Sequence, residues 1–287
     1  MRDHPFAMPG IATFSFTAAA MLAFAANSLL CRLALAGGGI DPASFGAIRV
    51  VAGAVALAVI VRLRAGSGAA GGDWISAAML FAYVAFFSFA YVSLSAGTGA
   101  LILFGTVQLT MFGWALRGGE RFTSAAWCGL ALAAAGLVFL VLPGVSAPPL
   151  FGAALMALAG AAWGVYSLRG RAGGDPLRAT AGNFLRAAPL ALVLWLPFAD
   201  VARADAAGIE LAVVSGAGTS GVGYALWYTA LRELTAMRAA TVQLSVPLIT
   251  AVGAVVFLAE PVTWRLVLAS VAILGGIALV LARRAKR

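Results

Sequence analysis

Long apolar runs, separated by short groups of Gly, Pro and charged residues, follow one another along the 287-residue chain. A transmembrane helix needs about 20 apolar residues to cross a hydrocarbon core of about 30 Å. Ten runs approach or exceed this length and predict ten helices, with Asp and Pro marking the starts of two, at Asp41-Pro42 and Asp175-Pro176. The approximate ranges are 12–36, 42–62, 74–94, 98–116, 123–142, 150–168, 177–197, 209–231, 235–258 and 262–282.

The composition excludes a water-soluble globule. Hydrophobic residues make up 63% of the chain and charged residues 10%, whereas soluble domains average about 45–50% and about 25%. The net charge of +9 does not indicate nucleic acid, because the basic residues lie in short clusters between apolar runs and not on one soluble face. The sequence therefore predicts an all-α membrane protein.

The positions of Lys and Arg predict an orientation. With the N-terminus inside, fourteen of the nineteen lie in cytoplasmic segments, three lie on the outer side, and Arg49 and Arg186 lie within helices. Short basic loops stay in the cytoplasm. We therefore expect a multi-pass protein of a bacterial-type inner (plasma) membrane with both termini in the cytoplasm.

The two halves of the chain repeat each other at offsets of 135–140 residues. Residues 1–144 and 145–287 are therefore predicted to be two five-helix repeats. Because five is an odd number, the second repeat enters the membrane from the opposite side and forms an inverted-topology pair around a central cavity, as is typical of secondary transporters. The matching positions are Arg32 and Arg169, Arg49 and Arg186, Thr106–Leu109 and Thr241–Leu244, Glu120 and Glu260, Thr123 and Thr263, and Gly136 and Gly276.

A similar motif opens the last predicted helix of each half. It is Gly119-Glu120-Arg121-Phe122-Thr123 in the first half and Ala259-Glu260-Pro261-Val262-Thr263 in the second. With the embedded arginines and the five-plus-five plan, they make nearly the whole chain similar to the EamA-type exporters of the drug/metabolite transporter superfamily. The stretch from Ser93 to Phe122 more narrowly resembles the aromatic amino-acid exporter branch. This resemblance implies export of amino acids. One departure is Ala26-Asn27-Ser28, where many relatives carry Trp-Gly.

Polar residues within the predicted helices are candidates for substrate contact, since polar groups in a membrane usually face the bundle interior or a water-filled cavity. Asn27, Gln108 and Gln243 are the main uncharged amides. They bind either the substrate or a neighbouring helix. Pro247 lies four residues after Gln243, so the Gln243 carbonyl loses its helical donor and becomes a candidate acceptor for a substrate ammonium group.

Arg49 and Arg186 each need a partner, because a central arginine costs at least about 2.5–3.5 kcal/mol on insertion scales. Their occurrence in both halves favours a structural or gating role, which we also assign to Pro247 as a hinge. The alternative is capture of a substrate carboxylate.

Aromatic residues are the third group of candidates. Tyr83 lies on a stripe in the third helix, and Trp163, Tyr224 and Trp227 lie in the sixth and eighth. Packing is the alternative role for such a stripe, but Tyr and Trp deep in a helix need polar partners. A cavity of rings with a few amides would suit aromatic or large neutral amino acids.

The acidic residues predict how transport is driven. Every Asp and Glu lies in a loop or near a helix end, and the single histidine is His4. Proton relays in membranes commonly use embedded Asp, Glu or His, so we expect a facilitated uniporter that works by alternating access. The alternatives are an exporter of another metabolite or drug, a proton-coupled antiporter and a channel.

Several kinds of partner are not expected from the sequence. Two cysteines without metal-ligand spacing predict no metal, and the absence of a catalytic constellation argues against an intramembrane enzyme. Residues 216–221 match a dinucleotide-binding pattern, but they lie in an apolar run and not between a strand and a helix. We interpret them as small surfaces for close helix crossing or as room beside the cavity. We expect a small-molecule substrate and lipid as partners, no cofactor, no nucleic acid and no obligatory protein partner.

Overall fold

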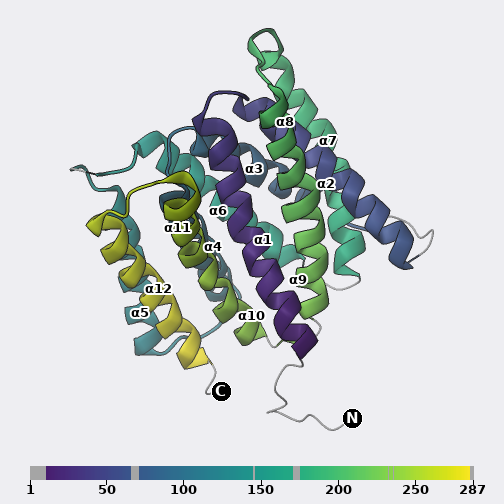
Figure 1. Cartoon of the computed structure of the whole chain (residues 1–287). Coiled ribbons are helices and arrows are strands. Elements are labelled where there is room, and N and C mark those ends of the chain that lie inside the picture. The colour runs from purple at the N-terminus through teal and green to yellow at the C-terminus, as the bar shows by residue number, and fades with distance from the viewer. Residues whose placement is uncertain are drawn as a thin grey trace.

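The computed structural model describes residues 11–65, 71–144, 146–170, 175–231, 233–234 and 236–284, and they are almost entirely helical (Figure 1). The first half contains α1 (Ile11–Ala36), α2 (Pro42–Ala65), α3 (Trp74–Tyr91), α4 (Ala96–Arg117) and α5 (Ser124–Val141). The second half contains α6 (Leu150–Arg169), α7 (Pro176–Trp195), the 3-10 helix η1 (Leu196–Val201), α8 (Ala206–Val213), the π-helix η2 (Val214–Val222), α9 (Gly223–Leu231), α10 (Ala236–Gln243), α11 (Ser245–Leu258) and α12 (Trp264–Arg284).

Nine helices in the described part of the chain are long and apolar enough to cross a membrane, which agrees with the predicted all-α membrane class. The ends of the ten predicted runs differ from the observed ends by at most three residues. The continuity of two runs was predicted wrongly. The eighth is α8, η2 and α9 in succession, with α-helical parts of only 8 and 9 residues, and the ninth breaks at Leu244.

Aspartates start four of the helices. Asp41, Asp73, Asp175 and Asp205 each accept hydrogen bonds from backbone N–H groups in the first turn of the helix that follows. These side chains satisfy donors that no helical carbonyl can reach. The two Asp-Pro starts expected from the sequence are thus confirmed.

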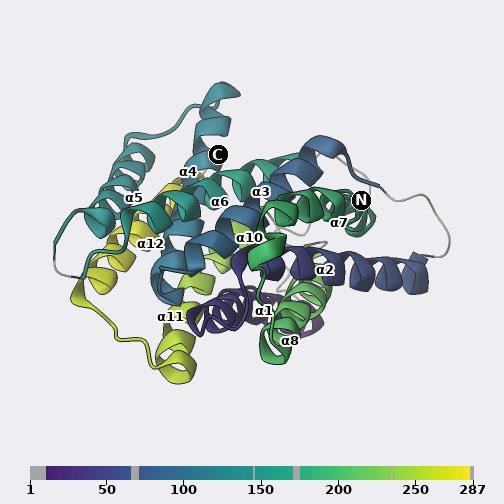
Figure 2. The ribbon, with the colours of Figure 1, turned by 90° about the horizontal axis from the view of Figure 1, so that it is seen from above.

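The helix packing brings both halves together. Figure 2 shows α5 and α12 on one side of the bundle and α2 and α7 on the other, and each of these pairs is in extensive contact. Between them, α3 and α4 pack on α6, and α1 packs on η2, α9 and α11. Helices from the two halves therefore alternate through the bundle.

Glycines allow the closest helix crossings. A Cβ atom at Gly129 in α5 would lie 2.5 Å from the carbonyl oxygen of Gly276 in α12. A Cβ atom at Gly216 in η2 would overlap the carbonyl oxygen of Arg49 in α2. The expectation that residues 216–221 form a surface for close crossing therefore agrees with the structure. This crossing places η2 beside Arg49 of α2.

Candidate binding cavity

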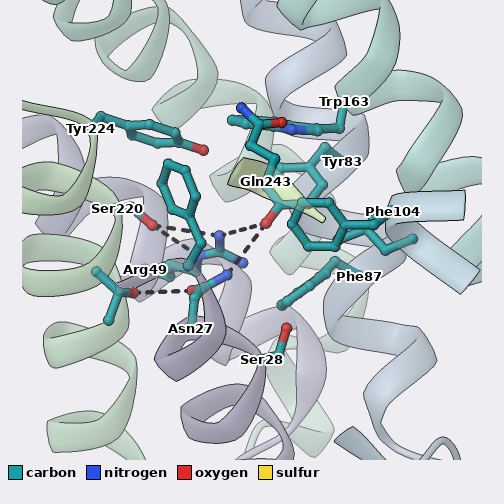
Figure 3. A pocket seen from close by; sticks show the side chains of 13 residues that line it. Asn27, Ser28, Arg49, Tyr83, Phe87, Phe104, Trp163, Ser220, Tyr224 and Gln243 are labelled. Atoms are coloured by element: carbon teal, nitrogen blue, oxygen red, sulfur yellow. Dashed lines mark hydrogen bonds between the residues drawn. The ribbon is translucent and has the colours of Figure 1, made fainter. Parts of the chain in front are cut away.

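A cavity with an empty volume of about 460 Å³, open solvent included, lies between helices of both halves. Figure 3 shows side chains from several helices converging on it. It is lined by Phe24, Asn27, Ser28, Arg49, Tyr83, Phe87, Leu103, Phe104, Trp163, Thr219, Ser220, Tyr224 and Gln243.

Arg49 of α2 is the charged residue in this lining, and its relative exposure is 1%. Its Nη2 donates to the Tyr83 hydroxyl at 3.2 Å and to the Ser220 hydroxyl at 3.4 Å. The guanidinium carbon also lies 5.3 Å and 5.0 Å from the ring centroids of Tyr83 and Phe87, within the range of a cation–π interaction. In the described part of the chain, Arg49 forms no ion pair and its Nη1 has no hydrogen-bond partner.

Asn27 of α1 joins three helices through its amide. Its Oδ1 accepts hydrogen bonds from Ser215 at 2.7 Å and Thr219 at 3.2 Å, both in η2, and its Nδ2 donates to the Tyr83 hydroxyl at 3.3 Å. The two hydroxyl donors fix the orientation of the amide, so its NH₂ group faces Tyr83.

Aromatic rings form much of the remaining wall. Trp163 of α6 packs on Tyr83 with ring centroids 4.9 Å apart, and it stacks on Tyr224 of α9 at 5.4 Å with an interplanar angle of 24°. Phe24 packs on Tyr224 at 5.7 Å. Rings from both halves thus face the same cavity.

Six of the residues singled out from the sequence line the cavity, and they come from both halves. These are Asn27, Arg49, Tyr83, Trp163, Tyr224 and Gln243. The helix break at Leu244 lies directly after Gln243, where Pro247 has no N–H to offer the Gln243 carbonyl.

Four other candidates lie outside the lining. Trp227 is 7% exposed and packs on Phe24, and half-buried Gln108 lies on α4. Pro247 is buried in α11. Arg186 donates through Nη1 to the carbonyl oxygens of Gly71 at 2.8 Å and Gly182 at 3.0 Å.

Some lining residues were not predicted. Thr219 and Ser220 belong to the Gly-rich stretch that we interpreted as a crossing surface or as room beside the cavity, but their hydroxyls were not singled out as a polar cavity wall. Phe87 lies one turn beyond Tyr83 on the same stripe of α3, which the sequence identified, but only Tyr83 of that stripe was selected as a candidate. Phe24, Ser28, Leu103 and Phe104 carry no sequence signal that separates them from packing residues. The buried amide of Asn183 was also missed, but it lies elsewhere and accepts from the Asp73 N–H.

Comparisons with known proteins agree with this arrangement. Residues 150–282 match the EamA-like transporter family. A relative that is an uncharacterized protein of Pseudomonas aeruginosa is 54% identical over 281 residues, which is 98% of each chain.

This chain belongs to the EamA-like transporter family.

A solved crystal structure of a protein that is 19% identical in sequence superposes on this chain with a TM-score of 0.68. The match covers 95% of this chain and 98% of the chain in that structure. At that identity the likeness concerns the fold alone. By its family match the chain is a multi-pass membrane transporter of the EamA type, and members of this family are not enzymes.

Polar clusters lie at both ends of α3 in the EamA transporter. At its C-terminal end, Arg32 donates through Nε to Glu260 at 3.1 Å and through Nη1 to the Tyr91 carbonyl at 3.0 Å. The other carboxylate oxygen of Glu260 accepts from the Ala96 N–H at 2.8 Å. The cluster therefore ties the end of α1 and the start of α4 to the α11–α12 connection.

At the N-terminal end of α3, Arg169 donates to Asp73 at 3.0 Å and to the Ser76 hydroxyl at 3.1 Å. The hydrogen bond from Ser76 and the neighbouring Arg169 guanidinium lower the pKa of the Asp73 carboxyl to about 2. This end is thus held by a carboxylate that stays ionised at neutral pH.

Proposed function

We propose that this EamA transporter exports aromatic or large neutral amino acids from the cytoplasm by alternating access. The observation that carries the proposal is the cavity, in which a wall of rings meets a small number of polar groups. Small-molecule sites are usually apolar and aromatic, with a few placed polar groups that fix orientation. Export by the aromatic amino-acid branch of the family, which the stretch from Ser93 to Phe122 resembles, fits this chemistry.

The aromatic wall supports recognition of a ring or a large apolar side chain. The rings of Trp163, Tyr83 and Tyr224 lie at centroid separations of 4.9 Å and 5.4 Å, within the 4.5–7 Å typical of aromatic pairs, and an aromatic substrate side chain would extend this group of rings. The tyrosine hydroxyls and the indole N–H let such a wall tolerate water when no substrate is bound.

Gln243 supports recognition of the ammonium group. Its side-chain amide lines the cavity, and α10 ends at this residue. The side-chain and backbone carbonyl oxygens together offer acceptors of the kind an ammonium group requires.

The packing supports the ten-span, inverted-repeat topology. Under the repeat, the contact of α3 with α6 corresponds to that of α9 and η2 with α1, and both are extensive. The α5–α12 and α2–α7 contacts each join two helices that are equivalent in the repeat. In this topology α8, η2 and α9 together are the eighth of the ten spans. The N-terminal end of α1 and the C-terminal end of α12 lie at the same end of the bundle (Figure 1). We infer that both termini face the cytoplasm of an inner (plasma) membrane.

The two ends of the bundle support alternating access. Arg32 and Arg169 are equivalent in the repeat, as are Glu120 and Glu260. Arg32 binds Glu260, whereas Arg169 binds Asp73. Each end of α3 thus carries an ion pair of its own, which a transporter that rocks about a central site can form at one face and break at the other.

The buried polar residues support transport that is not coupled to protons. In the described ranges they are Ser, Thr, Asn and Arg, and none of these side chains exchanges a proton near neutral pH as a carboxylate or histidine relay does.

The test is flux through purified protein in liposomes. We expect saturable counterflow of phenylalanine, tryptophan and leucine, weak competition by lysine, and the same rate with or without a pH gradient. Trp163→Ala is expected to raise the KM for phenylalanine. Trp114→Ala is the matched control, because Trp114 is 54% exposed.

Two results would contradict the proposal. Absence of amino-acid flux, with flux of another metabolite, would show that the substrate is wrong. Amino-acid flux that requires an imposed pH gradient would show that the transporter is proton-coupled.

A further inference from the structure

We propose that Arg49 is the subsite that binds the negatively charged group of the substrate, which for an amino acid is its carboxylate. This inference rests on the proposed function, because it takes the cavity as the substrate site. It adds that Arg49 contacts the substrate and that the group contacted is negatively charged.

The charge of Arg49 is buried and, within the described part of the chain, uncompensated. Arg49 is 1% exposed and, in the described ranges, has no ion pair. A buried guanidinium surrounded only by neutral groups is unfavourable. An anionic ligand would supply the missing charge, so ligand binding here has a large electrostatic component.

The guanidinium of Arg49 also has free hydrogen-bonding capacity. Nη1 of Arg49 has no partner among the described residues, while Nη2 and Nε are held by the hydroxyls of Tyr83 and Ser220. Figure 3 shows the guanidinium between these two hydroxyls, inside the group of lining side chains. A planar guanidinium presents N–H groups in the geometry that a carboxylate accepts.

The other buried or embedded arginines show how unusual this is. Arg186 donates to two backbone carbonyls, of Gly71 and Gly182. Arg265 donates to three carbonyls at the end of α5, one of which belongs to Leu142. Its Nε also lacks a partner, but its charge meets the negative end of a helix dipole. In the described structure Arg49 has no carbonyl partner, so a structural role leaves its Nη1 unexplained.

Arg49 and the neighbouring Tyr83 hydroxyl are preorganised. The Tyr83 hydroxyl accepts hydrogen bonds from both Arg49 and Asn27, so these bonds do not use its own hydrogen, which is free to donate to a ligand. Asn27 is in turn fixed by Ser215 and Thr219 of η2. Neighbouring helices thus hold the guanidinium and a hydroxyl in place before the ligand arrives.

This assignment narrows the ligand class to zwitterions and organic anions. A cationic amine would be repelled by Arg49, and none of the lining residues is acidic. Among the alternative substrates, other metabolites and drugs, the cationic ones are therefore disfavoured.

The experiment compares ligand pairs that differ only at the carboxyl group. We would titrate purified protein with phenylalanine and phenylalaninamide, and with 3-phenylpropionate and 3-phenylpropionamide, using calorimetry. In the wild type, each carboxylate is expected to bind about 10- to 100-fold more tightly than its amide, the range of a charged hydrogen bond. In Arg49→Gln this preference is expected to fall to about one, and in Arg49→Lys to be reduced but kept.

Arg64→Gln is the matched control, because Arg64 lies on the same helix and is exposed; its carboxylate preference is expected to equal that of the wild type. The proposal is overturned if the wild type binds acid and amide equally, or if Arg49→Gln retains the preference. The comparison of acid and amide binding by the wild type tests the proposal even if Arg49→Gln does not fold. Phenylpropionate binding without phenylalanine transport would contradict the proposed function and leave Arg49 as an anion site.

Discussion

Two adjacent glycines of α12 give a direct test of the fold. A Cβ atom at Gly276 would lie 2.7 Å from the backbone nitrogen of Ala133 and in overlap with the carbonyl oxygen of Gly129, both in α5. A Cβ atom at Gly275 would have no atom within 4 Å. The two positions lie in the same helix, so Gly→Ala changes helix propensity similarly at both. A difference in stability between the two variants therefore reports the contact between α5 and α12.

The expected effects have opposite signs. Gly275→Ala is expected to stabilise the protein by about 0.5–1 kcal/mol, because alanine has less backbone freedom to lose on folding. At Gly276 the opposing atoms are backbone and cannot rotate away, so α5 and α12 would have to separate by about 1 Å to reach an ordinary contact of about 3.5 Å. Such overpacking typically costs about 1–3 kcal/mol.

The assay is thermal unfolding of both variants in detergent, followed by circular dichroism. The unfolding temperature is expected to rise for Gly275→Ala and to fall for Gly276→Ala. Equal stability of the two variants would mean that α5 and α12 do not meet at this glycine, and the packing of the two halves at that edge would be refuted.

Three further predictions concern the ends of the helices and the break after Gln243. Because folding lowers the pKa of Asp73 to about 2, its ionised form stabilises the folded protein above the unfolded value of about 3.9. The stability difference between wild type and Asp73→Ala should therefore be full at pH 6 and decline as pH falls from about 4 to about 2; a difference that grows in acid would contradict this. Glu260→Gln removes the charge that holds Arg32 and the Ala96 N–H, so labelling of Ser28→Cys by a membrane-impermeant maleimide from the outer face should increase, whereas Glu210→Gln should leave it unchanged. Pro247→Ala restores an N–H for the Gln243 carbonyl and should raise the unfolding temperature while lowering amino-acid flux; Pro189→Ala, which changes a proline inside α7, is the control, and equal flux in both variants would argue against a role for the break.

The sequence by itself determined the membrane class and nearly all helix ends. Apolar runs of membrane length have few alternatives in a chain that is 10% charged, because each unpaired backbone group in lipid is costly and only helices satisfy them locally. The aspartate caps at Asp41 and Asp175 could be found for the same reason, since capping depends on residues within one turn.

The sequence also selected six of the cavity residues, because polar and amphipathic side chains in a membrane tend to face the interior. It did not find the π-helix η2 or its hydroxyls. A π-helix depends on how a segment packs against its neighbours, and here Ser215 and Thr219 reach Asn27 on another helix.

Only the tertiary structure distinguished the members of each repeated pair. Arg49 and Arg186 are equivalent in sequence, as are Gln108 and Gln243, yet Arg49 and Gln243 line the cavity while Arg186 binds two backbone carbonyls. The periodicity of a helix specifies which of its residues share a face, but the neighbour that this face meets is set by contacts between segments more than 100 residues apart. Those contacts give Arg186 two carbonyl partners and leave Nη1 of Arg49 without a partner among the described residues.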